Sequence, residues 1–173
     1  MKRLIIVAAT ASLVAAQAEV VLDESFSYDD GPIILQAAHT WKNHSGTEEQ
    51  TEMVDGRLNL SQAASEDINA MLPRGPYKKS GGGTMYASFD VEFTELPSGG
   101  GSYFAHFKDK GTGYRGRIVA QAIGAEGGAL RIGVTSKGKV STAVFDSDLH
   151  LETVYKVVIA LNLADARTTL WVD

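Results

Sequence analysis

The chain contains no cysteine among its 173 residues. It therefore has neither a disulfide framework nor thiol chemistry, and a zinc site built on cysteine is excluded. Proline is scarce, with four residues, whereas 18 glycines lie mostly between apolar segments. Glycine in such places is typical of turns that join many short strands. The composition therefore favours a β-rich protein without covalent cross-links.

Positive charge is also in short supply. The chain carries 16 lysines and arginines against 21 acidic residues, a net charge of −5. Nucleic-acid binding needs a basic surface, so we expect no nucleic-acid partner. An acidic chain also gives no reason to expect attraction to anionic membranes.

The one long apolar segment lies at the N-terminus. Lys2 and Arg3 precede an apolar run over 4–14, and Ala16-Gln17-Ala18 stands before Glu19. A charged start, an apolar centre and small residues at a cleavage point predict an export signal over 1–18. The run is too short for a comfortable membrane span and no second one follows, so we expect no span in the mature chain.

Removal of the signal would leave 14 basic against 21 acidic residues, a net charge of −7, because Lys2 and Arg3 are the only charged residues in it. We therefore expect a secreted or cell-envelope protein. The absence of cysteine from an exported protein fits a bacterial source better than a small eukaryotic ectodomain.

Residues 19–173 are enough for one domain with a sizeable core. Alternation of apolar and polar residues predicts a β-hairpin over Tyr155–Val172, with its turn at 163–166, and a strand over Thr84–Phe93 with one apolar face. Helical periodicity is weak, and only Ser61–Leu72 could hold a turn or two. Further short strands are predicted over Val20–Phe26, Arg57–Leu60, Ser102–Lys108, Arg117–Ile123, Ala129–Thr135 and Lys139–Phe145.

Strands at this spacing predict an all-β sandwich or barrel, and connections too short for helical crossovers favour antiparallel order. The sequence stops at Asp173, directly after a predicted strand. We therefore expect a C-terminally truncated fragment whose last strands are missing.

Several segments, in order, resemble the concanavalin A-like lectin/glucanase superfamily, especially laminin-G-like modules of secreted bacterial proteins. These segments are Glu24–Tyr28 with Asp30-Gly31, Trp41, Val54–Leu58, Tyr86–Val91, Tyr155–Val158 and Thr169–Asp173. The resemblance implies a jelly-roll sandwich of two antiparallel sheets. It does not assign a function, because the superfamily includes lectins, hydrolases and inert adhesion modules.

The resemblance also implies a structural calcium ion near the first strand, held by oxygen ligands. Asp23 or Glu24 and the Gly56 carbonyl are the candidate ligands. The alternative is that Asp55-Gly56 is an ordinary turn and Asp23 a surface charge. No other cofactor is expected.

No catalytic residue is assigned. Asp90 and Glu92 lie two apart on a predicted strand and would face one side about 6–7 Å apart, a separation that a glycoside hydrolase can use. Laminarinase-type members of the superfamily carry a Glu-x-Asp-x-x-Glu strand motif, and here Ser88 and Phe93 stand where its two glutamates are expected. A solvated strand face is the competing interpretation.

Sugar binding would need aromatic rings that stack on pyranose faces. Trp41, Tyr103 and Tyr114 are the candidate ligand contacts, although residue type alone favours a packing role for each of them. Period-two alternation places His106 on the face of Phe104, where a hydrogen-bonded core histidine is expected.

We therefore predict a secreted, non-catalytic binding module whose partner is a polysaccharide or a cell-surface protein. Two alternatives stay open. One is a glycoside hydrolase-like enzyme with unrecognised carboxylates, and the other is a structural or adhesion module of a larger envelope protein.

Overall fold

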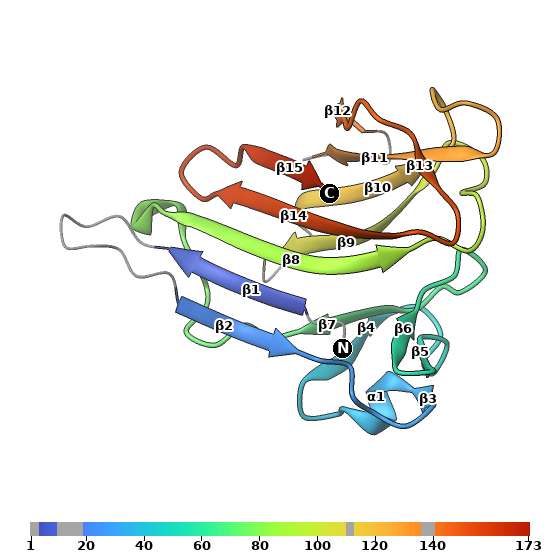
Figure 1. Ribbon diagram of the computed structural model, residues 1–173. Helices are drawn as coiled ribbons and strands as arrows, with labels where there is room; N and C mark the ends of the chain where they lie inside the picture. Colours follow the sequence, from blue (N-terminus) through green and yellow to red (C-terminus); the bar gives the residue numbers. More distant parts are fainter. Residues whose placement is uncertain (1–3, 10–18, 110–112, 136–140) are drawn as a thin grey trace. The chain divides into compact units, whose positions relative to one another are not determined.

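The computed structural model describes residues 4–9, 19–109, 113–135 and 141–173 (Figure 1). The fold is all-β, with antiparallel sheets, one four-residue helix α1 (Ile33–Gln36) and a single 3-10 turn (Lys79–Gly81) among these residues. The described chain divides into two compact units, one over 24–75 and one over 4–23 and 76–173. No helix in these described ranges is long and apolar enough to cross a membrane.

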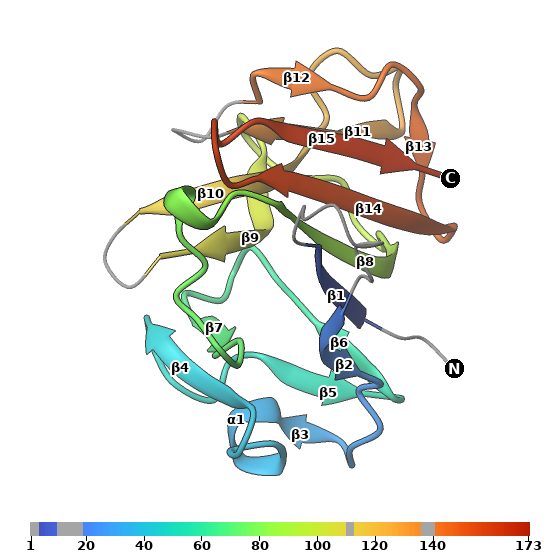
Figure 2. The ribbon, with the colours of Figure 1, turned by 90° about the vertical axis from the view of Figure 1, so that its left-hand side faces the viewer.

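The first sheet of the larger unit has the strand order β15-β14-β8-β1-β2 (Figures 1 and 2). Its strands are β1 (Leu4–Ala9), β2 (Glu19–Glu24), β8 (Thr84–Glu92), β14 (Val154–Asn162) and β15 (Thr168–Val172). The long register between β8 and β14 runs from Val154 opposite Glu92 to Asn162 opposite Thr84.

The second sheet has the order β12-β11-β10-β9, and β13 also pairs with β11. Its strands are β9 (Ser102–Lys108), β10 (Tyr114–Gln121), β11 (Ala129–Thr135), β12 (Ala143–Val144) and β13 (Leu149–His150). This sheet positions the candidate site described below.

One apolar core cluster draws on both of these sheets. Its buried members are Ala87, Val157 and Ile159 from the first sheet and Ile118, Ala120, Leu130, Ile132 and Leu149 from the second. Phe104 of β9 also meets the rings of Phe89 and Phe93 edge-on, with centroids 6.2 and 5.7 Å away. Burial of this apolar surface is the main force that holds the unit together.

The smaller unit contains a three-stranded sheet and a two-stranded sheet. The first is β3 (Gly31–Pro32), β5 (Glu52–Val54) and β6 (Arg57–Asn59), and the second is β4 (Trp41–Ser45) with β7 (Asp67–Ala70). Its own core is small and consists of Ile33, Ala37 and Met53, all fully buried.

Most strand predictions are confirmed. The C-terminal hairpin is β14–β15, and the strands predicted at 84–93, 102–108 and 129–135 are β8, β9 and β11. The strand predicted at 117–123 instead runs over 114–121. Of the predicted strand over 139–145, only β12 is formed, and 139–140 lie outside the described residues.

Ser61–Leu72, the segment that could have held a helical turn or two, contains strand β7 (Asp67–Ala70) instead. Pairing with β4 and the packing of Ile68 on the small core override the ambiguous local pattern. Residues 4–9, which belong to the predicted export signal, form β1 opposite β8.

Candidate functional site

Two of the three predicted ligand contacts, Tyr103 and Tyr114, come together on neighbouring strands β9 and β10. Their ring centroids are 6.4 Å apart. The His106 ring lies 5.7 Å from that of Tyr103 and 4.9 Å from that of Tyr114, the latter edge-to-face. With Arg117 these residues form a group that we call the aromatic–arginine cluster, and all four are half-buried.

Arg117 is the centre of the cluster. Its guanidinium carbon lies 4.7 Å from the Tyr103 ring centroid and 3.9 Å from that of Tyr114. A guanidinium over an aromatic face is attracted by the ring quadrupole, with a gain of about 0.5–2 kcal/mol depending on solvent exposure. The two tyrosine rings are therefore held in place by a cation that touches both.

Two irregularities in the β9–β10 pairing bring these side chains onto one face. In a regular strand, residues three apart, such as Tyr114 and Arg117 or Tyr103 and His106, point to opposite faces. The register shifts between Arg115 and Ile118, where Gly116 has a φ of 54°, and again between Ile118 and Val119. Each shift inserts an extra residue and re-aims the side chain beside it.

The register identifies the face. Ile118 belongs to the core cluster, whereas its neighbour Val119 lies opposite Tyr103. Strand β10 pairs regularly with β11 over 117–121, so Ile118 and Val119 alternate there and Tyr103 lies on the side of the sheet away from that core. Lys108 is directly opposite Tyr114 in the pairing, so it extends the same surface.

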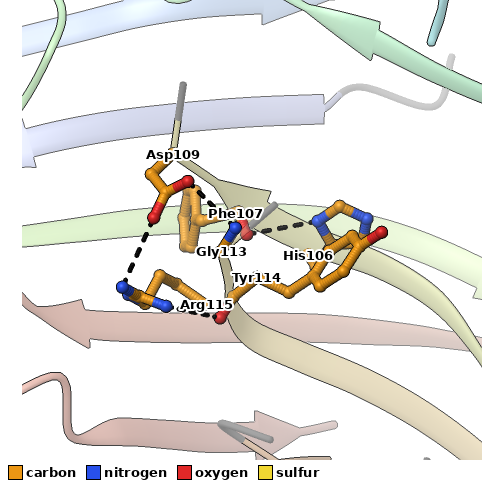
Figure 3. A network of polar contacts seen from close by, with 6 residues as sticks. All are labelled: His106, Phe107, Asp109, Gly113, Tyr114 and Arg115. Carbon is orange, nitrogen blue, oxygen red and sulfur yellow. Dashed lines mark hydrogen bonds and ion pairs between the residues drawn. The ribbon is translucent and has the colours of Figure 1, made fainter. Parts of the chain in front are cut away.

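Polar contacts hold the β9–β10 hairpin closed beside the cluster (Figure 3). The Asp109 N–H donates to the Gly113 carbonyl at 3.0 Å, and the Gly113 N–H donates to Asp109 Oδ1 at 3.0 Å. Arg115 Nη2 pairs with Asp109 Oδ2 at 3.3 Å, and its Nη1 donates to the Tyr114 carbonyl at 3.0 Å. The Asp109 carboxylate is thus engaged by the hairpin itself.

Trp41, the third predicted ligand contact, lies in the smaller unit. Its indole Nε1 donates to Glu24 Oε2 at 2.9 Å, and its ring stacks on Phe26 with centroids 5.8 Å apart. Glu24, only 5% exposed, also accepts hydrogen bonds from the Phe26 N–H at 2.8 Å and from the Tyr28 hydroxyl at 3.1 Å. Burial, followed by the hydrogen bond and charge of Glu24, raises the pKa of Tyr28.

The predicted calcium ligands differ in their exposure to solvent and in their hydrogen bonds. Asp23 is exposed at the end of β2, and both carboxylate oxygens of Glu24 accept the hydrogen bonds described above. Gly56, with a φ of 69°, forms the β5–β6 turn, in which the Asp55 N–H donates to Asp30 Oδ1 at 2.9 Å. Across the described ranges, no group of three or more acidic, histidine or cysteine side chains is placed to hold a metal ion. Calcium stays a prediction from the resemblance.

Asp90 and Glu92 alternate with the core-packed Phe89 and Val91 on β8, so both face away from the core. Asp90 forms a cross-strand ion pair with Lys156, Nζ to Oδ1, at 3.2 Å. A surface pair of this kind contributes little to stability.

His106 and Arg117 belong to the cluster but were not among the ligand contacts predicted from the sequence. The bulge separates His106 from Phe104, since Phe104 packs on the core and His106 contacts the two tyrosines. The available signal was Gly116 inside Tyr114-Arg115-Gly116-Arg117, because a glycine within a strand often marks a bulge.

Comparison with known proteins gives no relative. The chain matches no protein-family model, no curated protein and no solved structure.

Proposed function

We propose that this protein is a secreted, non-catalytic carbohydrate-binding module and that the aromatic–arginine cluster contacts the sugar. The observation that carries the proposal is the pair of half-buried tyrosine rings, 6.4 Å apart, which Arg117 holds on one sheet face. Rings fixed in advance lose little conformational entropy when a pyranose stacks on them. Polar groups of the same surface can then donate to hydroxyls.

The proposed architecture is the concanavalin A-like jelly roll, in which two antiparallel sheets enclose a core. Its support is the core cluster, whose residues come from both five-stranded sheets. Export through the signal at residues 1–18 and the structural calcium ion are parts of the same proposal. Both rest on sequence patterns.

The enzyme alternative has less support. Asp90 is engaged by Lys156, and Ser88 follows the same alternation, so β8 offers two carboxylates and no third. A surface-protein partner would use the same cluster face and is separated from a sugar by the experiment below.

The test is a pull-down and titration of the purified protein against a panel of polysaccharides, in calcium and in EDTA. We expect saturable binding that is lost in Tyr103→Ala and in Tyr114→Ala. Tyr86→Ala is the matched control, because Tyr86 is 37% exposed but lies on β8 of the other sheet. Loss of binding in EDTA would support the calcium prediction.

Two results would count against the proposal. A folded protein that binds no glycan would favour the surface-protein or adhesion alternative. Equal losses in Tyr86→Ala and Tyr114→Ala would mean that sugars do not bind at the cluster.

A further inference from the structure

We infer that the aromatic–arginine cluster binds an acidic saccharide, with Arg117 donating to the carboxylate or sulfate group of the sugar. The inference rests on the proposed function and deepens it, since it names the class of ligand. Its first support is the distribution of charge on strands β9 and β10.

Two cations, Arg117 and Lys108, lie on this part of an acidic chain, beside His106. Arg117 and His106 belong to the cluster, and Lys108 lies opposite Tyr114 in the register. Asp109, at the end of the hairpin, has its carboxylate engaged by Arg115 and by the Gly113 N–H. The whole chain carries a net charge of −5, so a cationic site here is complementary to an anionic ligand and not a reflection of overall charge.

The geometry of Arg117 lets one side chain do two things. Contact with Tyr103 and Tyr114 places the guanidinium over the ring faces, at 4.7 and 3.9 Å. Hydrogen bonds leave a guanidinium from its edge, in the plane of the group, and match the two oxygens of a carboxylate or the oxygens of a sulfate. The same arginine can therefore order the rings and receive the anion beside them.

An acidic sugar can contact both the tyrosine rings and the Arg117 guanidinium. Its ring presents C–H groups that stack on tyrosine, and its anionic substituent pairs with a cation adjacent to that ring. A neutral sugar would make no use of the charge on the guanidinium. A uronate and a sulfate ester share this chemistry, and the ligands tested must distinguish them.

The experiment measures affinity for polygalacturonate, for its methyl ester, for dextran sulfate and for unmodified dextran. The methyl ester carries a neutral ester in place of each carboxylate of polygalacturonate, and dextran carries a neutral hydroxyl in place of each sulfate of dextran sulfate. We expect a charged polymer to bind about tenfold or more tightly than its uncharged counterpart, the value of one charge-assisted hydrogen bond. Binding of polygalacturonate would identify a uronate as the ligand, and binding of dextran sulfate would identify a sulfate ester.

The variant Arg117→Met removes the charge at similar length and should weaken binding of the charged polymer about tenfold. Lys156→Met is the matched control, because Lys156 is 57% exposed and lies on the other sheet. It should bind as the wild type does. Comparison of each charged polymer with its neutral counterpart needs no variant, so the inference stays testable even where Arg117→Met fails to fold.

Equal affinity for charged and neutral polymers, unaffected by Arg117→Met, would overturn the inference and leave the carbohydrate-binding proposal standing. Equal losses in Arg117→Met and Lys156→Met would mean attraction by general charge, which also overturns it. Failure of the folded protein to bind any glycan would overturn both.

Discussion

The guanidinium carbon of Arg117 lies 3.9 Å from the centroid of the Tyr114 ring, although the two residues are three apart on one strand. In a regular strand their side chains would point to opposite faces. Gly116, at a φ of 54°, and the register shift around it bring them together. Contact between these two residues therefore depends on a local defect of the sheet.

The contact between Arg117 and Tyr114 should be measurable as a coupling free energy. In a double-mutant cycle of Arg117→Met and Tyr114→Leu, followed by urea unfolding, we expect a coupling of about 0.5–2 kcal/mol. The control cycle pairs Tyr114→Leu with Arg115→Met. Arg115 bonds the backbone carbonyl of Tyr114, not its ring, so its coupling should stay within about 0.5 kcal/mol. Similar values in the two cycles would contradict the arrangement.

Gly116→Ala should disturb both stability and binding. A Cβ at this position would occupy a left-handed backbone conformation and meet the Thr168 side chain at 3.2 Å. We expect a loss of about 1–3 kcal/mol in the free energy of unfolding, together with weaker glycan binding because the bulge orients the cluster.

The control for Gly116→Ala is Gly124→Ala. Gly124 also has a positive φ, 85°, but nothing lies within 4 Å of the point that a Cβ would occupy there. Gly124→Ala should lower the free energy of unfolding, because of its left-handed backbone conformation, and should leave glycan binding unchanged. Normal binding by Gly116→Ala would show that the bulge does not position the site.

Glu66 organises the loops of the smaller unit. Its Oε2 accepts hydrogen bonds from the N–H groups of Thr51 at 2.7 Å and Gln50 at 2.9 Å. Its Oε1 accepts from Asn43 Nδ2 at 3.2 Å and from the Glu49 N–H at 3.3 Å. Burial alone would raise the pKa of Glu66, but these hydrogen bonds outweigh it and hold the pKa below the ordinary value of 4.5.

A carboxyl with a lowered folded-state pKa stabilises the fold above its unfolded pKa and loses that contribution as the pH falls towards the folded value. We therefore expect Glu66→Gln to cost about 1–3 kcal/mol at neutral pH, with a cost that shrinks below pH 4.5. The measurement is urea unfolding against pH, followed by Trp41 fluorescence in a Trp171→Phe background, since the chain has two tryptophans, one in each unit.

The control for Glu66→Gln is Glu48→Gln, because Glu48 is exposed in the same unit. It should change the unfolding free energy by less than about 0.5 kcal/mol at any pH. A cost for Glu66→Gln that stays constant through acid pH would contradict the role given to its charge.

Sequence periodicity predicts the strands in which apolar and polar residues alternate clearly, so that one apolar face packs on the core. β8, β9, β11 and the β14–β15 hairpin have the bounds expected of them to within about two residues. In the smaller unit the strand expected over 57–60 is formed as β6, but β3, β5 and β7 were not predicted, because they have two to four residues each and form by pairing with strands distant in the sequence.

The candidate site was predictable only in part. Residue type alone selects Tyr103 and Tyr114 as possible ligand contacts, but the contacts of His106 and Arg117 depend on where the two register shifts fall. With regular alternation, His106 and Arg117 would each point to the sheet face opposite to the tyrosine on the same strand. Trp41 has the right chemistry for stacking, yet its N–H and ring are used by Glu24 and Phe26.

The N-terminal segment has two alternative roles, as a strand of the sheet or as an export signal that is cleaved off. Residues 4–9 form β1 beside β8, and the same residues are the apolar centre of the predicted export signal. We expect the exported protein to begin at Glu19 and so to lack β1, which intact mass and N-terminal sequencing would show. Ala18→Trp should block cleavage because the site needs a small residue there, whereas Gln17→Leu, between the two small positions, should not. An exported protein that begins at Met1 would show instead that β1 is a permanent strand of the sheet.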